Sequence, residues 1–307
     1  MEKKVFDIEA KRILIFLGIT FLFTYLLEIF LISPLVKSDD MIKMTIGQSL
    51  IAMMMFIPAI GVLLTRLLTR EGFKNLWIGP NLKGNIKYYI FAWFGPIVLT
   101  IIGGLLYFLV YPNNLTFEME YLSGVYEASG IEVDISQLKQ TIIIQGIVAI
   151  FLSPVLNALT CFGEEWGWRG YLLPKMSEKF KVLPMLLING VIWGLWHGPL
   201  TVLGHNYGVG YIGYPYLGIL SMCIFCIVLG TFFSYISLKT KSCIPAVIAH
   251  GSINGFSAIA IYLTKDGGNP FIGPAPIGII GGIAFIVVAI ICAYLLMKEE
   301  RSKVEVV

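Results

Sequence analysis

The chain has 307 residues, of which 57% are hydrophobic and 13% are charged. Soluble domains are about 45–50% apolar and about 25% charged, so a mean hydropathy of +0.82 excludes a water-soluble globular protein. The net charge of +3 is small, and the basic residues form no stripe that would bind nucleic acid. The five cysteines fall in or beside apolar segments, and we expect neither a disulfide framework nor a zinc finger.

Apolar segments of membrane-spanning length recur along the whole chain. A hydrocarbon core of about 30 Å needs roughly 20 helical residues, and the segments are continuously apolar rather than alternating, which excludes a β-barrel. The predicted helices are Ile13–Ser33, Thr45–Thr65, Tyr88–Tyr111, Thr141–Gly163, Val182–Leu203, Tyr214–Ser237, Cys243–Thr264 and Pro274–Met297. We therefore predict an all-α polytopic membrane helix bundle of about eight transmembrane helices, with residues 1–307 forming a single membrane domain.

Lysine and arginine are distributed unevenly between the predicted loops. Alternate loops and the two ends of the chain hold 18 of the 22 basic residues, which leaves on the other side only Lys37, Lys43, Lys139 and Lys265. Cytoplasmic segments carry the excess of basic residues in membrane proteins. We therefore predict that both termini lie in the cytoplasm and that the acidic segment 112–140 is an extracytoplasmic loop.

Ionisable residues are concentrated in one part of the chain. The first three predicted helices contain only Glu28, which we expect to be paired within the bundle. The region 141–264 contains Glu164, Glu165, Arg169, His197 and His250, together with the amides of Gln145, Asn157, Asn189 and Asn254. An unpaired charge within the bilayer costs at least a few kcal/mol, so these groups should face one another or a wet cavity and mark a functional site.

Helical geometry predicts which of these groups meet. At 1.5 Å of rise per residue, Glu164, His197 and His250 lie at similar depths on three different helices. Glu165 and Arg169 are four residues apart, share a helix face and are expected to pair. Glu164 is turned by about 100° from that face and can point elsewhere.

Three short motifs in this region resemble those of the CAAX protease and bacteriocin-processing family, whose members are intramembrane endopeptidases. The family pattern is E-E-x-x-x-R, F-x-x-x-H and H-x-x-x-N or D, on three helices. The corresponding residues here are Glu164, Glu165 and Arg169, then Trp193 and His197, then His250 and Asn254. Trp193 replaces the phenylalanine of the pattern, an exchange between bulky aromatics that we expect at a packing position. Trp193, the second glutamate and the arginine are expected to support the site.

The motif residues have the chemistry that peptide hydrolysis requires. The reaction needs an activated water, donors for the developing oxyanion and an acid for the leaving amine. We expect Glu164 to be the general base, His197 to share the water, and the neighbouring donors of His250 and Asn254 to form an oxyanion hole. The resemblance implies the same base and the same oxyanion hole.

A metal-dependent mechanism is the alternative. Glu164, His197 and His250 form a two-histidine, one-carboxylate set of the kind that zinc hydrolases use, with water as the fourth ligand. If Glu164 bound zinc, the remaining base would be Glu165, which is expected to pair with Arg169. The resemblance also implies a glutamate-dependent protease, so we expect no cofactor and keep zinc as the second possibility.

Two further residues have alternative interpretations. His205 falls in a predicted outer loop and is expected to be an ordinary loop residue. Cys161, three residues before Glu164, could suggest a cysteine protease, but a thiol in apolar surroundings is unreactive and is expected to pack.

The resemblance implies a membrane-embedded or lipidated (CAAX-type) protein substrate, with the lipid bilayer as the other partner and no nucleic acid. We expect a multi-pass protein of the cell membrane whose site opens toward the cytoplasm, because Glu164 and His250 lie nearer the basic ends of their helices. A non-catalytic self-immunity or partner-binding member of the family remains an alternative. A proton-coupled transporter is another, although transporters usually contain internal repeats and none is visible here.

Overall fold

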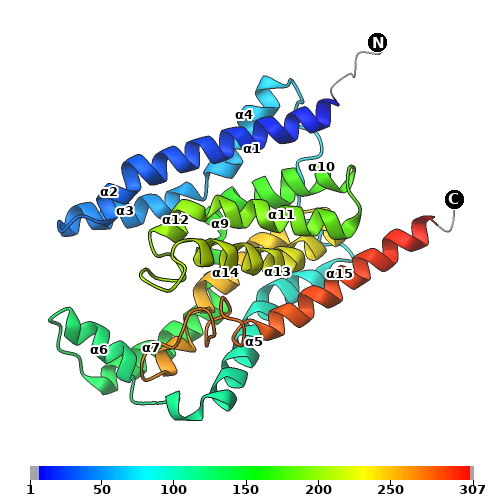
Figure 1. The fold of residues 1–307 in the computed structure, drawn as a ribbon. Coiled ribbons are helices and arrows are strands. Elements are labelled where there is room, and N and C mark those ends of the chain that lie inside the picture. Colours follow the sequence, from blue (N-terminus) through cyan, green and yellow to red (C-terminus); the bar gives the residue numbers. More distant parts are fainter. Residues whose placement is uncertain (1–6, 305–307) are drawn as a thin grey trace.

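The computed structural model describes residues 7–304, which form a bundle of helices (Figure 1). Within those residues, strand-like pairing is limited to two isolated bridges. Four helical segments are long and apolar enough to cross a membrane, or five if the bent pair α3 (Met41–Met54) and α4 (Ile57–Leu68) counts as one span. The predicted all-α polytopic membrane fold is confirmed, whereas the count of eight stays a prediction. Lys3 and Lys4, which contributed to the predicted orientation, lie outside the described residues.

The remaining elements follow in chain order. The first part contains α1 (Ile8–Leu27), the π-helical η1 (Glu28–Ile32), α2 (Ser33–Val36), α3, α4 and α5 (Ile86–Val110). The middle contains η2 (Pro112–Asn114), α6 (Glu120–Ala128), α7 (Ile135–Phe151), α8 (Ser153–Leu156), α9 (Ala158–Glu165), the π-helical η3 (Trp166–Leu172) and α10 (Leu173–Ser177). The last part contains α11 (Val182–Trp196), α12 (Gly198–Val202), α13 (Tyr216–Thr240), α14 (Ile244–Phe256), η4 (Ile261–Leu263) and α15 (Ile283–Val304).

The prediction of a single helix over Thr141–Gly163 is wrong. The structure forms α7, α8 and α9 instead, with breaks at Leu152 and Asn157. Pro154 stands in the first turn of α8, where its missing N–H would otherwise be needed to continue α7. Helix α7 also begins at Ile135, within the segment that was predicted to be a loop.

The last predicted helix begins later than expected. The structure starts α15 at Ile283 rather than at Pro274. The preceding segment is rich in glycine and proline, and Gly267 and Gly268 adopt positive φ angles of 88° and 71°. Such angles are readily available only to glycine, and both glycines lie in the irregular segment before Pro274. Residues 274–282, at the start of the predicted helix, form further turns and bends.

Two glycines bring α11 and α13 into direct backbone contact. A Cβ atom at Gly190 would lie 2.4 Å from Cα of Ile227, and one at Gly194 would lie 2.4 Å from Cα of Cys223. Small residues spaced four apart allow this approach in membrane helices. The close contact fixes the position of α11 relative to α13, and α11 carries the second of the three motifs.

Glycines also place the first motif against the bend between α3 and α4. A Cβ atom at Gly163 would lie 2.8 Å from the carbonyl oxygen of Met55, and one at Gly167 would lie 2.4 Å from Cβ of Pro58. The end of α9 and the start of η3 can therefore pack against that bend only because these two positions lack side chains.

The beginning of α1 and the end of α15 lie at the same end of the bundle (Figure 1). The α2–α3 turn, α12 and α6 lie at the other end (Figure 1). The side of the membrane that each end faces stays a prediction.

Candidate active site

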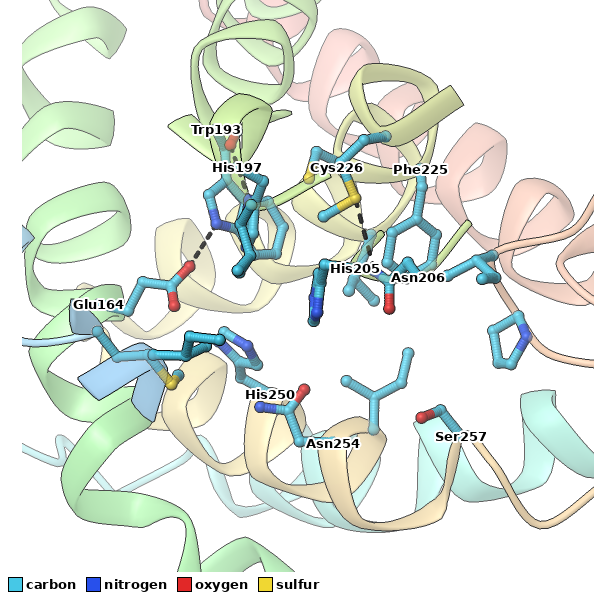
Figure 2. A pocket seen from close by; sticks show the side chains of 18 of the residues that line it. Glu164, Trp193, His197, His205, Asn206, Phe225, Cys226, His250, Asn254 and Ser257 are labelled. Carbon is cyan, nitrogen blue, oxygen red and sulfur yellow. Dashed lines mark hydrogen bonds between the residues drawn. The ribbon is translucent and has the colours of Figure 1, made fainter. Parts of the chain in front are cut away.

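Glu164 is a buried carboxyl group near the C-terminal end of α9. Its side chain is 1% exposed, and its Oε1 accepts a hydrogen bond of 2.5 Å from the indole Nε1–H of Trp193 on α11 (Figure 2). Phenylalanine, which the family pattern has at this position, has no such donor. Trp193 is therefore more than the packing residue that the sequence led us to expect.

Glu165 connects two other motif residues. Its Oε2 lies 3.0 Å from Nη1 of Arg169, and both side chains are completely buried. Its Oε1 lies 2.8 Å from Nδ1 of His250 on α14. The ion pair with Arg169 agrees with the helical spacing, whereas the bond to His250 was not predicted. Because a carboxylate only accepts, Nδ1 of His250 is the donor and its Nε2 is left for other contacts.

Arg169 lies in the π-helical turn η3, between aromatic rings. Its guanidinium carbon lies 4.0 Å from the ring centroid of Trp193 and 5.3 Å from that of Phe233. A Cβ atom at Gly230 of α13 would lie only 3.0 Å from Nη2 of the arginine. The rings and the glycine hold the guanidinium beside Glu165, and π-helical turns of this kind are frequent at functional sites.

His197 lies between α11 and α12, where the predicted span Val182–Leu203 is interrupted. Its Nδ1 lies 3.0 Å from the carbonyl oxygen of Trp193. A carbonyl only accepts, so Nδ1 carries the proton and Nε2 is the acceptor. Pro199, in the first turn of α12, accounts for the interruption because it lacks the N–H that would continue the helix.

One cavity of about 530 Å³ brings most of the motif residues together (Figure 2). Glu164, Trp193, His197, His250 and Asn254 all line it, which places residues from α9, α11 and α14 around one space. Much of the remaining wall is apolar and includes Met54, Met55, Phe225, Leu229, Ile253 and Ile261. Such a volume and such a mixture of apolar walls with a few polar groups are typical of small-molecule and peptide sites.

Other polar residues, which the sequence did not assign to the site, line the same cavity. His205 and Asn206 come from the loop between α12 and α13, and Gln48 comes from α3. The ring of His205 is parallel to that of His197, with an interplanar angle of 6° and 6.3 Å between centroids. His205 was expected to be an ordinary loop residue, and no motif or helical spacing in the sequence connects it to His197.

The zinc set considered from the sequence is not assembled. Among residues 7–304, the group whose ligand atoms all lie within 4.8 Å of one another is Glu164, Glu165 and His250, and it does not contain His197. Glu165 is already bonded to Arg169 and to His250. A dication would have to be bound next to a buried guanidinium, and this like charge opposes it. The residues present are therefore a poor fit for zinc.

Comparisons with known proteins identify the segment that carries the motifs. Residues 141–256 match the family described as type II CAAX prenyl endopeptidase Rce1-like. CAAX prenyl protease 2 of Methanococcus maripaludis is 28% identical over 104 residues, which are 34% of this chain. The match covers 38% of that relative's length. Over this segment, the chain is therefore similar to the Rce1-like family of CAAX prenyl endopeptidases.

Proposed function

We propose that the protein hydrolyses peptide bonds of membrane-associated or lipidated protein substrates, with Glu164 as the general base that activates water. One observation carries this proposal: a buried carboxyl group, held by one donor from Trp193, lines a cavity that also contains the side chains of His197, His250 and Asn254. The name of the relative, CAAX prenyl protease 2, supports a prenylated protein as the lipidated substrate.

The proposed reaction uses the groups around the cavity in turn. Oε2 of Glu164 accepts a proton from the water, Nε2 of His197 helps to orient it, and the water oxygen attacks the substrate carbonyl carbon. Nε2–H of the His250 imidazolium and the Asn254 amide donate to the resulting oxyanion. Glu164 then returns the proton to the leaving amine as the C–N bond breaks.

The role that we assign to Glu165 follows from its two contacts. Its carboxylate accepts from Nδ1 of His250 and balances the charge of the imidazolium that faces the oxyanion. Arg169 in turn pairs with the Glu165 carboxylate and holds it in place. No step in this scheme requires a metal ion, and we propose a metal-free glutamate-dependent peptidase.

Reconstitution in lipid vesicles tests the proposal with a panel of prenylated and plain membrane peptides. We expect Glu164→Gln to abolish cleavage without lowering the melting temperature, because the amide keeps the shape but cannot accept the proton. Glu118→Gln is the matched control, since Glu118 lies outside the cavity and its side chain is 68% exposed. Wild-type turnover in Glu164→Gln would disprove the mechanism. Inhibition by a chelator, reversed by zinc, would disprove its metal-free form.

A further inference from the structure

The helix break at His197 leaves a backbone carbonyl without its helical partner. In a continuous helix, the carbonyl of Leu195 would accept from the amide of residue 199, but this residue is proline. The hydroxyl of Tyr25 on α1 donates to that carbonyl at 2.6 Å. A Cβ atom at Gly198 would lie 3.2 Å from the same hydroxyl, so α1 packs directly against the break.

A second contact from α1 reaches the residue before His197. The indole Nε1–H of Trp196 donates to Oγ1 of Thr24 at 2.8 Å. Trp196 is 4% exposed and Thr24 is completely buried. The indole ring packs against the imidazole of His197, with 4.7 Å between centroids and an interplanar angle of 82°. Thr24 thereby fixes the ring that forms one wall of the His197 site.

Glu28 lies next to the other side of the break. It is the first residue of the π-helical turn η1 and is 1% exposed. Neither of its oxygens has a well-formed hydrogen bond to any residue between 7 and 304, so the side-chain partner predicted from the sequence is not found there. The turn η1 that carries Glu28 packs against α12.

We propose that Thr24 and Tyr25 are positioning residues for His197. They contact the two residues that precede it, Leu195 and Trp196, and thereby hold the imidazole where it can orient the water. This inference rests on the function proposed above for His197. Both residues lie outside the matched segment 141–256, so the similarity to CAAX endopeptidases does not reach them.

Variants that remove one hydrogen bond each test this proposal. We expect Thr24→Val and Tyr25→Phe to lower kcat by roughly tenfold with little change in KM, since the cavity wall is kept while the imidazole is loosened. Thr24→Ser should restore most of the activity because it keeps the acceptor. Thr20→Val is the matched control, since Thr20 is buried one turn earlier on α1 and its hydroxyl has no partner within the described chain.

A second measurement reports the reactivity of the His197 imidazole and does not depend on peptide cleavage. Diethyl pyrocarbonate modifies an unprotonated histidine nitrogen, and mass spectrometry of peptides gives the rate at His197, with His205 as an internal reference. We expect the ratio of the two rates to change by roughly threefold or more in Thr24→Val and Tyr25→Phe, and to stay at the wild-type value in Thr20→Val. Melting temperatures measured in parallel establish that the variants are folded.

The outcomes separate this proposal from the proposed function. If Thr24→Val and Tyr25→Phe keep the wild-type kcat and modification ratio while Glu164→Gln is inactive, the positioning role is overturned and the function stands. An equal loss in Thr20→Val would also overturn it, because the effect would then be general loosening of α1. If the wild-type protein cleaves no peptide, the proposed function fails and the modification ratio alone decides whether α1 positions His197.

Discussion

Glu164 and Glu165 are adjacent in the sequence, yet the helix turns them toward different partners. Glu164 bonds to Trp193 and lines the cavity, whereas Glu165 is enclosed between Arg169 and His250. We propose different roles for them: Glu164 exchanges a proton with a water in the cavity, and Glu165 holds the side chains of Arg169 and His250 in place.

Glu165→Gln is expected to reduce stability and activity together. The amide leaves Arg169 as a buried charge without its counter-ion, and removing one partner of a buried pair costs about 3–5 kcal/mol. A thermal melt and a cleavage assay, run beside Glu164→Gln, measure the two effects. Glu164→Gln should lose activity alone. A Glu165→Gln protein that melts like the wild type would show that the ion pair does not stabilise the bundle.

Trp193→Phe is expected to lower kcat by roughly threefold to tenfold with a small change in KM. Phenylalanine keeps an aromatic ring beside Arg169 but removes the hydrogen bond that orients Glu164, and a lost buried hydrogen bond costs about 1 kcal/mol or more. Trp166→Phe is the control, because the indole N–H of Trp166 is buried without a partner within residues 7–304. Equal kinetics in both variants would contradict a role for the Trp193 hydrogen bond.

At the scale of helices, the site depends on positions that lack side chains. Gly190 and Gly194 allow α11 to touch α13, and Gly163 and Gly167 allow α9 and η3 to reach the bend between α3 and α4. The proposed catalytic groups come from separate helices, so the distances between them are set by these close contacts. A displacement of α11 would move both Trp193 and His197.

Gly194→Ala is expected to destabilise the protein by about 1–3 kcal/mol, because the added methyl group meets the backbone of Cys223 rather than a mobile side chain. Gly18→Ala is the control, since nothing lies within 4 Å of a Cβ atom there. Alanine stabilises a helix relative to glycine by roughly 0.5–1 kcal/mol, so the control should melt at the same or a higher temperature. A stability increase in both variants would contradict the close packing of α11 on α13.

At the scale of the whole molecule, two predictions from the sequence conflict. The distribution of basic residues places the loop between α12 and α13 outside, yet His205 and Asn206 of this loop line the cavity. The cavity therefore reaches the side that the charge distribution assigns to the exterior, whereas the depths of Glu164 and His250 predicted an opening toward the cytoplasm. The side of the opening stays a prediction that labelling can decide.

Labelling with a membrane-impermeant maleimide is expected to modify Ile212→Cys in right-side-out vesicles and Lys83→Cys only after lysis. Ile212 is 95% exposed in the loop that contributes to the cavity, and Lys83 lies in an exposed basic loop. The five native cysteines are all buried and give a low background. The reverse pattern would reject the predicted orientation and would place this end of the cavity in the cytoplasm.

The class of the fold and the residues of the three motifs were predictable from the sequence. Long apolar segments reveal membrane helices because each helix satisfies its own backbone hydrogen bonds in lipid, so the signal is local. The pairing of Glu165 with Arg169 was equally predictable, since helical spacing relates residues of one helix. The motif residues could be named for the same reason, because each motif lies within a few consecutive residues.

The contacts that the motif residues make with other helices could be known only from the tertiary structure. The bonds from Trp193 to Glu164 and from Glu165 to His250, and the place of His205 in the cavity, depend on the rotation and approach of separate helices. The rotation and approach of the helices are set by glycine contacts between distant segments and by helix breaks at prolines. Spacing along one helix carries no information about them, because it fixes directions only relative to that helix's own axis.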